Sequence, residues 1–193
     1  YYMVLKDAEQ AQGVLRESQL TLSGDNLQIF LARSYEALGR WFDAETIYRS
    51  RYESAPDDLP RTQQLAAFYL GNVYQQPDRN LKVTPLLNKI LKAGAEKKIR
   101  GNDPGLLWAR RMGAKMLANT GDYQSLLKAE KLLASNSQNG ELTIDDKLAM
   151  ARILADRPEP EHRQKAIQLL ESVAAVQALD TQSELALGTL YYL

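Results

Sequence analysis

The sequence contains no cysteine, only one histidine and no long apolar segment. Without cysteine the chain can form neither a disulfide framework nor a thiolate metal site, and this absence leaves its compartment open. No window approaches the roughly 18 uninterrupted apolar residues that a membrane-spanning helix needs, so we expect a soluble chain and favour the cytoplasm. The formal net charge of zero argues against a protein that coats nucleic acid along its whole length.

Motifs for catalysis or cofactor binding are also missing. We find no nucleophile motif, no phosphate-binding loop and no metal-ligand spacing. The single histidine, His162, lies in a Pro-Glu-Pro-Glu-His-Arg turn and is interpreted as ordinary exposed surface, because one such residue rarely suffices for acid–base chemistry. The aspartate pairs at 57–58 and 145–146 are interpreted as charges that favour helix starts. We therefore expect no enzymatic activity, no cofactor and no metal.

The stretch 25–58 has the pattern of a helix, a tight turn and a second helix. Apolar and aromatic residues recur at three- and four-residue steps before Gly39, and a second such stripe runs from Asp43 to the break at 55–57. Small and aromatic residues, a glycine and a proline fall in a fixed order along it: Ala32, Tyr35, Gly39, Ala44, Tyr48 and Pro56. With these six residues in register, the stretch resembles a tetratricopeptide repeat, a helical pair of about 34 residues.

Degenerate copies with insertions follow, and the resemblance implies an all-α fold, a right-handed α-solenoid of stacked antiparallel helix pairs. We place complete repeats at 25–58, 59–102, 103–140 and 141–180, and truncated ones at 1–24, a second helix, and at 181–193, a first helix. No stretch alternates between apolar and polar residues for long enough to suggest a sheet. Because both ends carry truncated repeats, we expect a segment cut from a longer array, with open ends that could stack on another copy.

Helix starts within these repeats are predicted from their capping residues. Thr84-Pro85 reads as an N-cap and first helical residue, and so does Asp103-Pro104. The stretches 143–146 and 181–184 resemble capping boxes. The segment between Lys92 and Asp103 is the largest insertion relative to the family pattern, and it is either a binding loop or a longer connection.

In this family the first helix of each pair lines an inner wall that usually binds other proteins. When the family's inner-wall positions are mapped onto this sequence, they give a line of basic residues beside large apolar ones: Arg33, Phe68, Asn72, Trp108, Arg111, Lys115 and Arg152. Such a wall suits an acidic peptide or helix with apolar anchors, because arginine pairs with carboxylates in bidentate geometry. We expect a non-catalytic interaction scaffold. The alternative is that these are solvated charges without a common ligand.

A second hypothesis is RNA binding. From Lys82 to Lys115 there are nine basic and two acidic residues, a local charge of +7 beside Trp108. Such a patch could bind phosphate and stack a base. No recognised nucleic-acid motif accompanies it, so nucleic acid is the less favoured partner.

Overall fold

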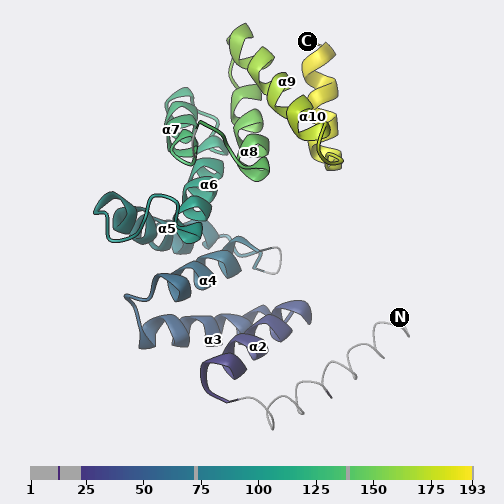
Figure 1. The fold of residues 1–193 in the computed structure, drawn as a ribbon. Helices are drawn as coiled ribbons and strands as arrows, with labels where there is room; N and C mark the ends of the chain where they lie inside the picture. The colour runs from purple at the N-terminus through teal and green to yellow at the C-terminus, as the bar shows by residue number, and fades with distance from the viewer. Residues whose placement is uncertain (1–12, 14–22, 72–73, 138–139, 193) are drawn as a thin grey trace. The chain divides into compact units, whose positions relative to one another are not determined.

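The computed structural model describes residues 13, 23–71, 74–137 and 140–192, and every regular element in these ranges is an α-helix (Figure 1). The predicted helix at 1–24 lies almost wholly outside them. The described helices are α2 (Gly24–Ala37), α3 (Trp41–Ser54), α4 (Leu59–Leu70), α5 (Arg79–Ala95), α6 (Pro104–Ala118), α7 (Tyr123–Ala134), α8 (Ile144–Ala155), α9 (Pro160–Ala174) and α10 (Thr181–Tyr192). The prediction of an all-α fold is confirmed. No described helix is long and apolar enough to cross a membrane.

Contacts divide the chain into two compact units, Tyr1–Ile90 and Leu91–Leu193. Within each unit, helices that follow one another in the chain pack together, as α2 does on α3 and α8 on α9. In the second unit α8 also packs on α6 and on α10, the helices two positions before and after it in the chain. This second kind of contact brings the alternate helices of that unit side by side.

The α2–α3 hairpin follows the predicted pattern. Gly39 adopts a left-handed backbone with φ of 71°, a conformation that glycine reaches without a Cβ penalty. The Arg40 N–H donates to the Tyr35 carbonyl at 2.8 Å and closes the helix end. Ala32 and Ala44 are fully buried, so their small side chains allow the two helices to approach closely.

Arg51 ties the helices of the first unit together. Its side chain is 2% exposed, and the guanidinium donates to both carboxylate oxygens of Asp25 on α2 and to Gln64 on α4. Beside it, the Tyr48 hydroxyl donates to Glu36 at 2.7 Å. A charge buried in this way is tolerated because its donors are satisfied.

Helix α5 begins at Arg79, so the predicted start at Thr84-Pro85 was wrong. Pro85 lies inside the helix, where it has no N–H to donate to the preceding turn. The Thr84 hydroxyl donates to the Asn80 carbonyl at 2.7 Å. The added turn is held by packing, because Val83 is fully buried and Lys82 forms an ion pair with Glu45 at 2.8 Å. Tertiary contacts therefore outweigh the local proline signal.

The core of the second unit is built from leucine, isoleucine and small residues of α6 to α10. Ala114, Ala151 and Ala166 are buried in it, whereas Gly188 on α10 is exposed, with no atom near its missing Cβ. Gly94 is a close approach that the repeat pattern did not indicate, because a Cβ there would lie 2.6 Å from Leu106. Gly94 thus lets the end of α5 pack against α6.

Side-chain caps start most helices of this unit. Asp103 accepts from the Leu106 N–H at 3.1 Å, as predicted, and Thr143 accepts from that of Asp146 at 3.3 Å. The predicted capping box at 181–184 was wrong by one residue, since Asp180 accepts from the Ser183 N–H at 2.7 Å. Thr181 is consequently the first residue of α10.

Helix α10 carries several exposed apolar side chains. Leu185 is 71% exposed and Tyr192 is 92% exposed. Exposed apolar groups of this kind can support association. Stacking of α10 on another copy stays a prediction.

Candidate functional site

The residues predicted to line one binding wall fall into different environments. On α2 Arg33 is exposed, whereas Phe68 on α4 is only 2% exposed and packs against the rings of Tyr48, Tyr69 and Tyr74. Phe68 is therefore a core residue and presents no surface to a partner. Asn72 lies outside the described residues.

The other four predicted residues belong to the second unit. Trp108, Arg111 and Lys115 lie on α6, and Arg152 lies on α8. All four are partly buried. Of these, Lys115 and Arg152 meet at one pocket, whereas Trp108 and Arg111 are not among its lining residues.

The pocket has a volume of about 460 Å³ and lies within the second unit. Helices α6, α8 and α10 supply its walls. Its lining residues are Lys115, Ala118, Asn119, Ala149, Arg152, Ile153, Ala155, Asp156, Gln182 and Ala186. Since α8 packs on both α6 and α10, three alternate helices meet at this place.

Alanine accounts for the hollow. Four of the ten lining residues are alanine, and Ala149 and Ile153 are almost fully buried, which gives the pocket an apolar floor. Lys115 and Arg152 line the same pocket. Each directly follows a buried alanine, Ala114 or Ala151, so its side chain leaves the helix beside the packed face.

The cations of the pocket influence each other. Burial lowers the pKa of the Lys115 ammonium, and the positive charges of Arg152 and Arg111 lower it further. Asp145 and Asp146 act in the opposite direction without reversing the shift. A bound anion would relieve this repulsion, whereas Asp156 already brings one acidic side chain to the lining.

Arg152 is incompletely paired. Its Nη2 lies 3.4 Å from Asp180 Oδ2 and 3.5 Å from Ser183 Oγ, which are long contacts. Its Nε is buried and, within the ranges the structure describes, has no hydrogen-bond partner. Buried donors of this type normally find an acceptor in the protein, in water or in a ligand. The pocket therefore offers a guanidinium donor alongside the Lys115 ammonium.

Polar groups that the sequence analysis did not select complete the lining. Asn119 and Asp156 are the residues that follow α6 and α8, and Gln182 lies in the first turn of α10. The two amides can donate to and accept from a peptide backbone. The periodic pattern gives no signal for Asn119 and Asp156, because both lie just beyond the helices that carry it.

Arg111 is committed to an internal ion pair. Its Nε lies 2.6 Å from Asp146 Oδ1 and its Nη1 lies 2.8 Å from Asp145 Oδ2. Asp146 is fully buried, and Asn136 donates to the same oxygen at 3.1 Å. Asp145 and Asp146 do lie in the first turn of α8, as interpreted, but they also hold an arginine that was predicted to face a ligand.

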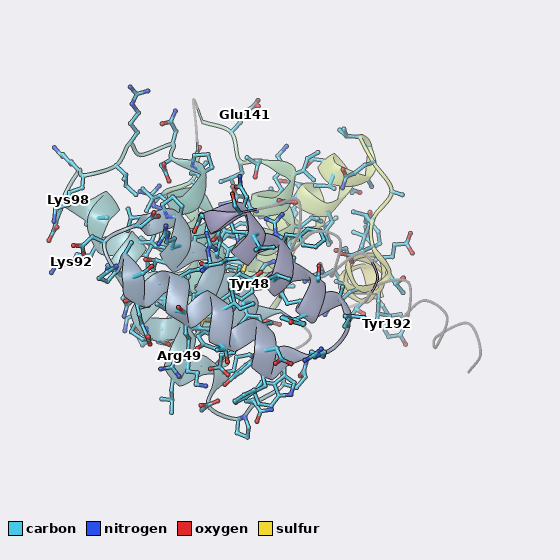
Figure 2. All side chains as sticks on the ribbon, turned by 90° about the horizontal axis from the view of Figure 1, so that it is seen from below. Tyr48, Arg49, Lys92, Lys98, Glu141 and Tyr192 are labelled. Carbon is cyan, nitrogen blue, oxygen red and sulfur yellow. The ribbon has the colours of Figure 1, made fainter. Side chains whose placement is uncertain are left out.

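Five of the nine basic residues between Lys82 and Lys115 form ion pairs with acidic groups. Lys92 and Lys98, which project near each other in Figure 2, both pair with Glu96. Three further basic residues pair with carboxylates outside the region, each within its own unit: Lys82 with Glu45, Lys89 with Asp57, and Arg111 with Asp145 and Asp146. Glu96 is already counted in the charge of +7, so it is the carboxylates outside the region that reduce this charge in the fold.

A further charged cluster joins α7 to the start of α9. Arg157 is 4% exposed and contacts Glu130 at 2.9 Å, Glu159 at 3.0 Å and the Tyr123 hydroxyl at 3.3 Å. His162 is partly buried, contrary to the expectation of ordinary exposed surface, and its Nδ1 lies 3.5 Å from a Glu159 oxygen. No group of histidine and acidic residues in the described part of the chain is arranged to hold a metal ion.

Comparisons with protein-family models, curated proteins and solved structures found no match to this chain.

Proposed function

We propose that this chain is a non-catalytic scaffold of the tetratricopeptide-like solenoid type, and that it binds an acidic segment of another protein. The contact point is the pocket formed by α6, α8 and α10. In a solenoid these would be the first helices of successive repeats and would line its concave groove. The packing of α8 on both α6 and α10 supports this arrangement.

One observation carries the proposal: Lys115 and Arg152 share an alanine-lined pocket in which Arg152 Nε is left without an acceptor among the described residues. A carboxylate is the natural ligand for an ammonium and a guanidinium held together. The apolar floor offers contact to the methylene groups of an aspartate or glutamate side chain. The amides of Asn119 and Gln182 can bind the peptide groups on either side.

Affinity capture from a lysate of the source cell tests the proposal. The bait proteins are the wild type, a variant carrying Lys115→Gln and Arg152→Gln, and the control Lys131→Gln, which alters an exposed lysine on α7 outside the pocket. Retained proteins and retained RNA are identified separately. Circular dichroism first establishes that all three baits are equally helical.

We expect a protein with an acidic segment to bind the wild type and the Lys131 variant and to be lost from the double variant. A synthetic peptide of that segment should then bind wild type directly, with affinity that falls as salt rises. Equal retention by all three baits would show that the pocket is not the binding site.

The RNA-binding alternative has weaker support, because five of the nine basic residues that suggested it are paired with carboxylates. The same capture experiment separates the two functions. Recovery of RNA alone, with strong salt dependence, would favour the basic region over the pocket.

A further inference from the structure

Lys115 combines three features that make a lysine nucleophilic. It is partly buried, it lines a pocket open to small molecules, and two guanidiniums, those of Arg111 and Arg152, act on it. Burial and neighbouring cations both disfavour the ammonium, so a larger fraction of this lysine is neutral amine near neutral pH. Only the neutral amine carries the lone pair that attacks a carbonyl carbon.

Arg152 adds a means of attracting a particular class of reagent. Its guanidinium lines the same pocket, and its buried Nε is without an acceptor in the described residues. A small donor that carries negative charge would be drawn to this group and held with its reactive carbon in the pocket. Alanines at 118, 149 and 186 leave the space for it.

We propose that Lys115 is a modification site, acylated in preference to other lysines by small acyl phosphates. The neutral Nζ attacks the carbonyl carbon of the acyl phosphate, and the bond from that carbon to the phosphate oxygen breaks. Phosphate leaves with the electron pair, and Nζ releases a proton to water. The products are an amide and inorganic phosphate, with no oxidation or reduction.

Acylation removes the positive charge of Lys115 and makes its side chain longer. The pocket then keeps Arg152 as its lining cation and has less free space. If the acidic-segment function proposed above holds, acylation weakens that binding; this consequence rests on the proposed function, whereas the modification itself does not.

Treatment of the purified chain with acetyl phosphate tests the modification. Peptide mass spectrometry follows the acetylation rate of Lys115 and of the exposed lysines Lys128 and Lys131 on α7. We expect Lys115 to react about threefold faster or more, and its rate to level off at a lower pH than that of Lys131. A rate equal to or below that of the two exposed lysines would overturn the proposal.

Variants at Arg152 test the role of the guanidinium. Arg152→Gln should lower the Lys115 rate toward that of Lys131, whereas Arg152→Lys, which keeps the charge, should retain most of it. Arg163→Gln on α9, outside the pocket, is the control and should leave the rate unchanged. Equal loss in Arg152→Gln and Arg152→Lys would contradict an electrostatic role. None of these rates requires the protein partner, so failure here is distinguishable from failure of the proposed function.

Discussion

Arg111 Nε lies 2.6 Å from the buried Oδ1 of Asp146 and so joins α6 to α8. Asn136 reaches the same oxygen from the end of α7, and it also donates to the Leu107 carbonyl on α6 at 2.9 Å. One carboxylate thus joins two helices and the segment that follows α7. This ion pair occupies the Arg111 guanidinium, whereas Lys115, one turn further along α6, lines the pocket.

Removing the buried carboxylate should strongly destabilise the second unit. We expect Asp146→Ala to lower the free energy of unfolding by about 3 to 5 kcal/mol, because it removes the buried carboxylate oxygen that accepts from both Arg111 Nε and the Asn136 amide. Urea denaturation followed by circular dichroism measures the change.

Asp145 offers a matched control on the same helix turn. It contacts the same guanidinium, but its side chain is 70% exposed. We therefore expect Asp145→Ala to cost less than about 1 kcal/mol. Similar losses for the two substitutions would mean that burial of Asp146 is not what makes this ion pair important.

Close packing of α2 on α3 gives a second prediction. Ala44 is fully buried, and Ala44→Leu should overpack the helix contact and cost about 1 to 3 kcal/mol. Ala67→Leu, on the exposed face of α4, is the control and should change stability little, since alanine and leucine have similar helix propensity. A thermal melt in which Ala44→Leu is as stable as wild type would count against the repeat register.

The sequence was most informative where a local rule determines the structure. Period 3.6 and Gly39 predicted the α2–α3 hairpin, and Asp103 predicted the start of α6. Local rules were insufficient where packing dominated. The N-terminal turn of α5 forms ahead of Pro85 because Lys82 and Val83 find partners in the core, and no nearby residue signals those contacts.

The candidate site was predictable only in part. The family's wall positions led to Lys115 and Arg152, which do share a pocket. The same positions also pointed to Arg111, whose ion pair with Asp146 spans 35 residues along the chain, about the length of one predicted repeat. An acidic residue at that spacing from a predicted wall arginine was the available signal. The hollow itself depends on the joint placement of four alanines on three helices, which requires the tertiary structure.

Asp122 provides a pH-dependent prediction. Hydrogen bonds from Ser125 and Thr120 stabilise its carboxylate and lower its pKa from 3.8 to about 2. Because the pKa is lower in the folded state, the carboxylate adds stability that is fully present above pH 3.8 and is lost as the pH falls through about 2. An NMR titration of the Asp122 carboxyl carbon should show the low pKa directly, and Thr120→Val should raise it.

Asp122→Asn is the matched variant for the stability measurement. An asparagine still accepts from the Ser125 N–H as an N-cap, but it does not titrate. We expect the melting temperature of this variant to fall less steeply than that of wild type between pH 4 and pH 2. A wild-type carboxyl that titrates at its ordinary pKa would contradict the prediction.

Filling the pocket should separate shape from charge in the proposed binding. Ala186 lies on α10 and lines the pocket without contributing charge, so Ala186→Leu should occupy the space for the ligand while Lys115 and Arg152 remain. We expect weaker retention of the acidic partner and a free energy of unfolding within about 0.5 kcal/mol of wild type, because the added atoms enter a hollow that is already open. Ala134→Leu, at the exposed end of α7, is the control. If Ala186→Leu binds as well as wild type while the glutamine variants do not, the cations attract the partner from the pocket's rim and the hollow is not needed.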